Sequence, residues 1–147
     1  MPYDRTSTPR PTVIQTAQRV LRTEGEALLA MIDRLPPDFE PAVAKILAAR
    51  GRVILSGIGK SGHIARKIAA TLSSTGTPAY FVHAGEASHG DMGTITPADI
   101  VIALSNSGET AELGDLIAHT RRFGIVLMAI TGAERSTLAQ AADFRLT

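Results

Sequence analysis

The chain contains no cysteine and no tryptophan, and its 147 residues include only two tyrosines and four phenylalanines. The lack of cysteine excludes disulfide bonds and metal sites built on thiolates. No apolar run approaches the roughly 20 residues of a transmembrane helix, and residues 1–20 hold no apolar segment typical of a signal peptide. These absences predict a cytoplasmic protein that does not associate with membranes.

An excess of charge of one sign is also missing. The 15 basic and 14 acidic residues leave a formal net charge of +1, and no long basic run is present. A nucleic-acid partner is therefore not expected, because surfaces that bind nucleic acids concentrate positive charge. Hydrophobic residues make up 44% of the chain, which predicts one folded domain with a substantial core.

The N-terminal part of the chain is predicted to be helical after a short tail. Residues 1–11 contain three prolines among Ser, Thr and Arg, so we expect a flexible tail there. Apolar residues recur every three or four positions over 12–35, which predicts an amphipathic helix that stops at Pro36-Pro37. A second helix is expected from about Phe39 to Gly51.

Beyond this region, short apolar runs alternate with helical stretches. Apolar runs begin at positions 53, 79, 100, 125 and 144 and predict five strands, the last of them cut short. Helices are expected at 61–74, 109–123 and 135–142. The alternation is typical of a three-layer α/β sandwich around a parallel sheet. With the flavodoxin-like order 2-1-3-4-5, ligands bind at the carboxyl ends of strands one and three.

Two loops rich in glycine and hydroxyl groups follow these two strands. Residues 57–62 read GIGKSG and residues 105–110 read SNSGET. Each loop opens a predicted helix, where backbone N–H and hydroxyl groups suit a phosphate. Tight turns that need glycine, and N-capping by Ser and Thr, explain part of both patterns without a ligand. They do not explain Lys60, whose positive charge opposes the dipole at a helix N-terminus.

The first loop also matches the G-x-G-x-x-G pattern of dinucleotide-binding proteins. That function needs an acid at the end of the second strand to bind the ribose. Here the strand ends in Val82-His83, and the nearest acid is Glu86. A dinucleotide-binding domain is therefore the weaker interpretation.

Two further groups of polar residues leave alternatives open. Residues 83–91 hold two histidines and two acids, which fit the local hydrogen bonds of a polar loop, a metal site, or direct contact of His89 with a ligand. Of the two functional interpretations, we favour ligand contact by His89 over the metal site. Glu109 and Glu112 lie three residues apart at the start of a predicted helix. Each fits a favourable contact with the helix dipole or a general base beside the ligand.

Together, these motifs resemble the sugar isomerase (SIS) domain family, and within it the bacterial arabinose-5-phosphate isomerases. The matching segments are residues 57–71, 74–78, 81–93 and 105–112, within a resemblance that spans about 12–147. The resemblance implies interconversion of D-arabinose 5-phosphate and D-ribulose 5-phosphate through an enediolate, an isomerase step of carbohydrate metabolism that supplies lipopolysaccharide biosynthesis. It also implies that no cofactor is required and that the chain forms a homodimer or homotetramer.

The resemblance further implies roles for individual residues. Lys60 and Glu112 match the catalytic residues, whereas Glu109 supports the site from outside. His83 matches a position that binds an inhibitory zinc ion. The positions that match contacts to the sugar phosphate are Gly59, Ser61, Gly76, Thr77, His89, Ser105, Asn106, Ser107, Gly108 and Thr110.

By the same resemblance, the SIS domain is expected to be incomplete at its C-terminus. Family members continue past residue 147 with the rest of the fifth strand, a further active-site glutamate and an active-site histidine, and most carry a pair of CBS domains. We expect the shortened fifth strand to leave an exposed sheet edge. The alternative function is a non-catalytic sugar-phosphate sensor, as in SIS domains of transcriptional regulators. Lys60 and Glu112 favour the isomerase.

Overall fold

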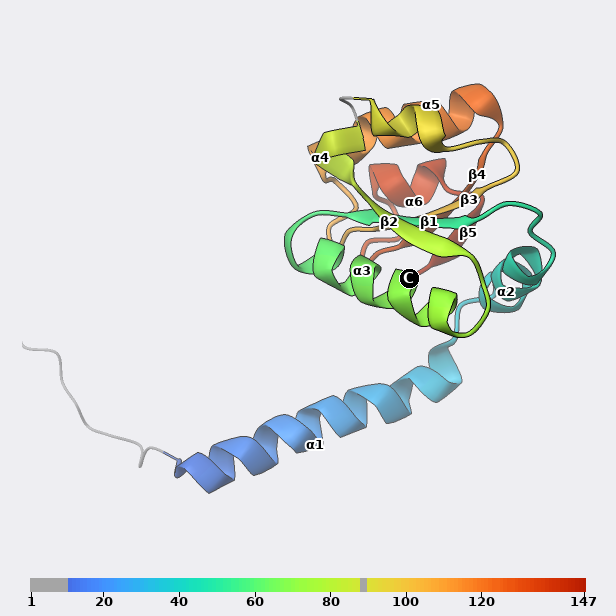
Figure 1. Cartoon of the computed structure of the whole chain (residues 1–147). Helices are drawn as coiled ribbons and strands as arrows, with labels where there is room; N and C mark the ends of the chain where they lie inside the picture. Colours follow the sequence, from blue (N-terminus) through green and yellow to red (C-terminus); the bar gives the residue numbers. More distant parts are fainter. Residues whose placement is uncertain (1–10, 88–89) are drawn as a thin grey trace, which may run out of the picture. The chain divides into compact units, whose positions relative to one another are not determined.

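A five-stranded parallel sheet organises the unit Pro36–Thr147, the larger of two compact units into which the chain divides. The structure, a computed structural model, describes residues 11–87 and 90–147. The sheet has the order β2-β1-β3-β4-β5, which confirms the strand order predicted from the sequence (Figure 1). The strands are β1 (Val53–Gly57), β2 (Ala79–His83), β3 (Ile100–Leu104), β4 (Val126–Ile130) and β5 (Phe144–Leu146).

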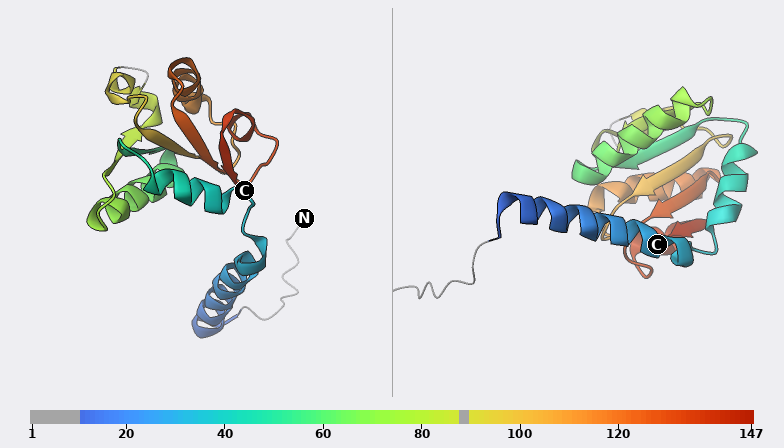
Figure 2. Two further views of the ribbon diagram at one scale, coloured as in Figure 1. Left: turned by 90° about the vertical axis from the view of Figure 1, so that its right-hand side faces the viewer. Right: turned by 90° about the horizontal axis from the view of Figure 1, so that it is seen from below.

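Helices cover both faces of the sheet, so the predicted three-layer sandwich is confirmed (Figures 1 and 2). Successive strand residues point into two separate cores: Ile54 and Val101 into one, Leu55 and Ile102 into the other. The strands are apolar on both faces, as is typical of buried parallel strands. On one face lie α2 (Phe39–Leu47) and α3 (Gly59–Ser74), and on the other lie α4 (Ala84–Ala87), α5 (Gly114–Phe123) and α6 (Thr137–Ala141).

Several helices are shorter than predicted. The stretch expected as one helix over 109–123 begins as the 3-10 turn η3 (Ala111–Leu113) and becomes α5 only at Gly114. The cause is local, because the Thr110 hydroxyl bonds back to Ser105 at 2.7 Å and holds the preceding residues in a loop. A further 3-10 turn, η2 (Asp91–Thr94), precedes β3.

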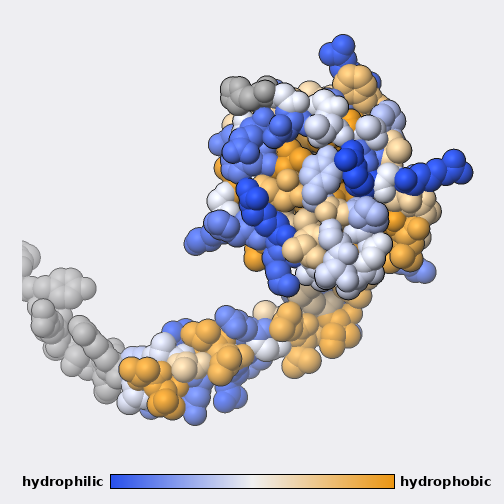
Figure 3. All heavy atoms as spheres, viewed as in Figure 1, coloured by the Kyte–Doolittle hydropathy of each residue, from blue (hydrophilic) through white to orange (hydrophobic). Residues whose placement is uncertain are grey.

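The unit Met1–Leu35 consists, in its described part, of α1 (Val13–Met31) followed by the 3-10 turn η1 (Ile32–Arg34). Thr12 begins the helix with a capping box: its hydroxyl accepts from the Gln15 N–H, and the Gln15 side chain accepts from the Thr12 N–H. No residue of α1 is buried, and Figure 3 shows apolar side chains on its surface. No helix in the described ranges has both the length and the apolar character needed to cross a membrane.

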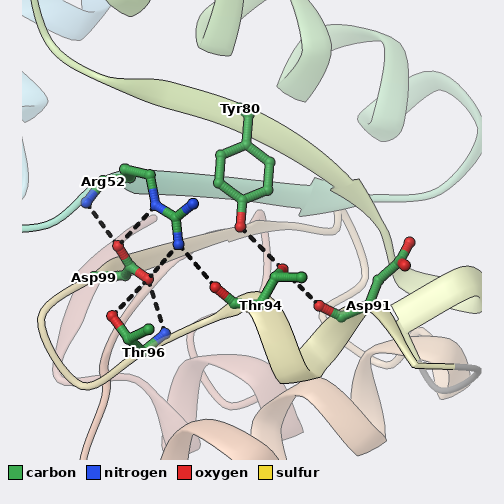
Figure 4. Close-up of polar contacts among 6 residues, drawn as sticks. All are labelled: Arg52, Tyr80, Asp91, Thr94, Thr96 and Asp99. Carbon is green, nitrogen blue, oxygen red and sulfur yellow. Dashed lines mark hydrogen bonds and ion pairs between the residues drawn. The ribbon is translucent and has the colours of Figure 1, made fainter.

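A buried carboxylate ties together the amino ends of β1 and β3 (Figure 4). Asp99 accepts hydrogen bonds from the Arg52 N–H at 2.7 Å, from the Arg52 guanidinium at 3.2 and 3.3 Å, and from the Thr96 N–H and hydroxyl at 2.8 and 2.9 Å. The guanidinium also donates to the Thr94 carbonyl at 2.8 Å and lies 5.0 Å from the centre of the Tyr80 ring. Burial raises the pKa of Asp99, but the hydrogen bonds outweigh burial and lower this pKa to about 2.

The outer edge of β5 is partly covered by the start of α2. Leu146 accepts a hydrogen bond from the Thr131 N–H at the end of β4, so the neighbouring N–H of Arg145 points away from the sheet. This N–H donates to a carboxylate oxygen of Asp38 at 2.8 Å. One of the free edge groups expected from the short last strand is therefore satisfied within the chain.

Candidate functional site

A pocket of about 260 Å³ opens at the carboxyl ends of β1, β3 and β4. Both glycine-containing loops contribute to it, so they converge as the strand order predicts. One part of the lining is polar and another is apolar. The lining residues are Lys60, Ser61, Ile64, Leu104, Ser105, Asn106, Ile130, Thr131 and Gly132.

The glycines of the first loop bring α3 against the end of the sheet. A Cβ atom on Gly57 would lie 2.9 Å from the Leu104 carbonyl oxygen, and one on Gly62 would lie 2.9 Å from the Gly57 carbonyl oxygen. Gly59 has a φ of +51°, which favours glycine. The G-x-G-x-x-G spacing is thus explained by close backbone packing and needs no dinucleotide.

Lys60 projects from the first turn of α3 at the pocket. Its side chain is exposed, and within residues 11–87 and 90–147 the structure shows no hydrogen bond or ion pair to it. α3 is 16 residues long, so its dipole disfavours a cation at this end. A bound anion would offset this repulsion, which makes Lys60 a candidate for contact with a ligand.

Residues 105–110, here called the serine loop, use part of their hydroxyl groups to hold their own shape. The Ser105 hydroxyl is buried, accepts from the Gly108 N–H at 3.0 Å and shares a 2.7 Å hydrogen bond with Thr110. The Ser107 hydroxyl accepts from the Glu109 N–H at 3.2 Å. Asn106 and Ser107 are exposed, so they are the side chains of the loop most accessible to a ligand.

The connection from β4 to α6, residues 131–136, forms a further wall of the pocket. The Asn106 carbonyl oxygen accepts from the Gly132 N–H at 3.1 Å and from the Thr131 hydroxyl at 3.3 Å. Thr131 and Gly132 are absent from the site residues predicted from the sequence, as are the apolar residues Ile64 and Ile130. A hydroxyl–glycine pair directly after the fourth strand is the signal that would have indicated this wall.

Glu109 is not among the residues that line the pocket and instead binds the start of α6. One carboxylate oxygen accepts from the Thr137 N–H at 2.8 Å, and the other accepts from the Thr137 hydroxyl at 2.7 Å. These hydrogen bonds lower the pKa of Glu109 below its ordinary value. Because Thr137 engages both carboxylate oxygens, the contacts of Glu109 agree with a supporting role.

Gly108 fits against the same segment. Its φ is +67°, and a Cβ atom there would overlap the Ser136 hydroxyl. Its carbonyl oxygen accepts from the Leu138 N–H at 3.0 Å. The serine loop is therefore docked on the β4–α6 connection by backbone as well as side-chain contacts.

Several other residues predicted for the site are not among those that line this pocket. Within the two glycine-containing loops these are Gly59, Ser107, Gly108 and Thr110. Glu112 is exposed on η3, just after the serine loop, and is not among the lining residues. Gly76 and Thr77 lie between the end of α3 and the start of β2, which places them at the amino ends of the strands. Within one chain they are therefore at the opposite end of the strands from Lys60.

The histidines predicted for ligand or metal binding are only partly described. His83 ends β2 and lines a second pocket of about 260 Å³, and its Nδ1 atom is buried without a hydrogen-bond partner among the described residues. His89 lies outside the described residues. The described ranges contain no group of three or more His, Cys, Asp or Glu residues suited to a metal ion. Zinc binding at His83 thus stays a prediction.

Comparison with known proteins agrees with this architecture. The SIS domain family matches residues 46–147, which include all five strands and the whole pocket. The chain belongs to the SIS domain family.

Two curated relatives and one solved structure illustrate this membership. The chain is 52% identical over 133 residues to the arabinose 5-phosphate isomerase KdsD of Pseudomonas aeruginosa, covering 90% of this chain and 41% of the relative. It is 48% identical over 132 residues to KdsD of Escherichia coli K12, covering 90% of this chain and 40% of the relative. The E. coli CFT073 protein c3406 in complex with arabinose 5-phosphate superposes with a TM-score of 0.84 at 39% identity, covering 91% of this chain and 71% of that chain. The chain thus spans about two fifths of the length of these curated relatives.

Proposed function

We propose that this SIS domain binds a sugar phosphate and serves an isomerase that interconverts D-arabinose 5-phosphate and D-ribulose 5-phosphate. The observation that carries the proposal is the placement of Lys60 opposite the serine loop, exposed and without a partner among the described residues, in a chain 52% identical to KdsD of Pseudomonas aeruginosa. A cation facing hydroxyl, amide and backbone N–H groups is suited to an anionic, hydroxylated ligand.

The pocket has complementary surfaces for the two parts of such a ligand. The polar groups of Ser61, Asn106 and Thr131 lie on the same pocket as Lys60 and suit the phosphate and hydroxyl groups. The apolar side chains of Ile64 and Ile130 suit the C–H face of the carbon chain. The volume of about 260 Å³ leaves room for one small sugar phosphate.

In the proposed reaction, a base removes the proton from C2 of the open-chain aldose, and electrons move to the C1 carbonyl oxygen to give an enediolate. Transfer of the O2 proton to O1 and return of the base-held proton to C1 then give the ketose. Lys60 would stabilise the negative oxygen of the enediolate. Glu112, with its exposed carboxylate beside the serine loop, is the proposed base. The oxidation of C2 and the reduction of C1 balance within the substrate, so the reaction needs no redox cofactor.

We also infer that the chain assembles into a homodimer or homotetramer. The support is the apolar stripe of α1, because a helix with no buried residue gains stability when this face is covered. An inhibitory zinc ion at His83 and a cytoplasmic location belong to the same proposal.

The test is proton NMR of arabinose 5-phosphate in deuterated water with the wild-type chain, Lys60→Ala and Lys67→Ala. Wild type should replace the C2 proton with deuterium and form ribulose 5-phosphate, and Lys60→Ala should lower this rate about 100-fold or more. Lys67 is a matched control, since it is an exposed lysine on the same helix whose ammonium donates to the Thr71 hydroxyl at 3.2 Å.

An equal rate for wild type and Lys60→Ala would overturn the catalytic role of Lys60. A folded wild-type chain that binds arabinose 5-phosphate without exchange would restrict the proposal to binding, which is the sensor function. A chain that shows neither binding nor exchange would overturn the proposal.

A further inference from the structure

We propose that Glu109 is a positioning residue, which holds the serine loop in its ligand-binding shape by clamping Thr137. The proposal rests on the proposed function for the class of ligand, a sugar phosphate. The clamp itself is a property of the structure and is tested separately below.

The clamp joins two segments that are distant in sequence. Glu109 and Thr137 lie 28 residues apart, and both carboxylate oxygens are used, at 2.8 Å to the N–H and 2.7 Å to the hydroxyl. Hydrogen bonds to an ionised acceptor are short and about twice as strong as neutral ones. The geometry thus fixes both the distance and the orientation of the serine loop relative to α6.

Further hydrogen bonds join these segments close to the clamp, one of them from the Thr131 hydroxyl to the Asn106 carbonyl oxygen at 3.3 Å. Gly108 accepts from Leu138 at 3.0 Å, and Asn106 accepts from Gly132 at 3.1 Å. Asn106 and Gly132 themselves line the pocket. A serine loop released by loss of Glu109 would shift one wall of the pocket against the other, and a displacement of about 1 Å is enough to impair catalysis about 100-fold.

The clamp also keeps the negative charge of Glu109 out of the pocket lining. A carboxylate in a loop that binds an anion would repel it if the carboxylate faced the ligand. Glu109 instead directs both oxygens to Thr137 and is not among the residues that line the pocket. The loop thereby gains a strong tie without placing a negative charge in the pocket.

The experiment compares Glu109→Ala, Glu109→Gln and the matched control Asp38→Ala. Asp38 also accepts a backbone N–H, that of Arg145 at 2.8 Å, but it lies at the β5 edge. Two quantities are measured for each variant: the Kd for arabinose 5-phosphate by calorimetry, and the amide hydrogen-exchange rates of Gly132 and Leu138 by NMR. Thermal unfolding of each variant reports the loss of stability that any structural role would cause.

We expect Glu109→Ala to weaken binding about tenfold or more and to accelerate exchange at Gly132 and Leu138. Glu109→Gln should recover part of both effects, because its side-chain oxygen still accepts one hydrogen bond from Thr137. Asp38→Ala should destabilise the protein to a similar extent and leave both quantities unchanged.

Two results would overturn the clamp. One is a Glu109→Ala variant whose Kd and exchange rates equal those of Asp38→Ala. The other arises if wild type does not bind arabinose 5-phosphate, a result that refutes the proposed function and leaves amide exchange as the test of the clamp. In that case, unchanged exchange rates in Glu109→Ala would reject the clamp, and faster rates would support it.

Discussion

The polar groups at the two ends of the parallel strands, here called the amino edge and the carboxyl edge, have opposite arrangements. At the amino edge, the buried Asp99 accepts five hydrogen bonds from Arg52 and Thr96, and the charge of Arg52 is paired (Figure 4). At the carboxyl edge, Lys60 is exposed, and the described residues offer it no partner. The first edge stabilises the domain, and the second keeps donors available for a ligand.

Under the proposed function, stability and binding belong to opposite ends of the same strands. Even the carboxyl edge has an internal division, since Ser105 and Glu109 hold the serine loop in shape while Asn106 and Ser107 stay exposed. Substitutions at the two edges should therefore have separable effects on stability and on binding.

The largest effect on stability is expected from Asp99→Ala at the amino edge. The substitution removes the acceptor of two backbone N–H groups, whereas the Arg52 guanidinium keeps its hydrogen bond to the Thr94 carbonyl. The loss should cost about 3–5 kcal/mol of unfolding free energy. Urea denaturation measures this loss. Asp143→Ala is the control, because its exposed carboxylate pairs with Arg121 at 3.6 Å and accepts from one backbone N–H; its expected cost is about 1 kcal/mol. Similar losses for both would contradict the assigned importance of Asp99.

The next effect is expected from Gly108→Ala in the serine loop. A methyl group there overlaps Ser136 in addition to straining a φ of +67°, so the unfolding free energy should fall by about 2–4 kcal/mol. Gly124→Ala is the matched control, with a φ of +62° and nothing within 4 Å of the added Cβ atom. It should cost only about 1 kcal/mol. Thermal unfolding of both variants distinguishes the overlap from the backbone strain.

The pH dependence of the unfolding free energy should report the ionisation of Asp99 at the amino edge. The pKa of Asp99 is about 2 in the folded chain against an ordinary value of 3.8, so the folded state favours the ionised carboxylate. This contribution, about 2 kcal/mol, is complete above pH 3.8 and is lost as the pH falls toward 2. Denaturation of wild type and Asp99→Asn between pH 7 and pH 2 measures it. Their difference in unfolding free energy should shrink below about pH 4; a constant difference would show that ionisation of Asp99 is not responsible.

The smallest effect on stability, with the opposite sign, is expected from Lys60→Met. Removal of a cation from the first turn of α3 should raise the unfolding free energy by up to about 0.5 kcal/mol. Binding of arabinose 5-phosphate should weaken about tenfold or more, because a charged hydrogen bond to the ligand is lost. Thermal unfolding and calorimetry measure the two changes. Lys67→Met should change neither the unfolding free energy nor the affinity for arabinose 5-phosphate by more than a small amount. Equal effects of both substitutions would contradict the assignment of ligand binding to Lys60 at the carboxyl edge.

The arrangement of the strands could be predicted because it depends on patterns that extend over many residues. Five apolar runs separated by helical periodicity determine a parallel sheet, and the strand order then brings residues 57–62 and 105–110 together. Helix boundaries depend on single hydrogen bonds, such as that between Ser105 and Thr110, which delays α5 to Gly114. Such contacts leave no periodic signal in the sequence.

The site was predictable only in part for the same reason. Lys60 and the serine loop have local signals, a charge at a helix start and a cluster of hydroxyl groups. The wall formed by Thr131 and Gly132, and the clamp between Glu109 and Thr137, join residues that are more than 20 positions apart. From residue types alone, Glu109 is as suitable a base as Glu112, and only the position of its oxygens assigns it to Thr137.

The hydrogen bond between Asp38 and Arg145 has a consequence for the order in which the domain folds. Its partners are separated by 107 residues, and the Arg145 N–H is oriented only once β5 has paired with β4. Closing so long a loop is entropically costly until the intervening strands have assembled. In a refolding experiment, protection of the Arg145 amide should therefore arise late, and this one amide would mark the completion of the sheet.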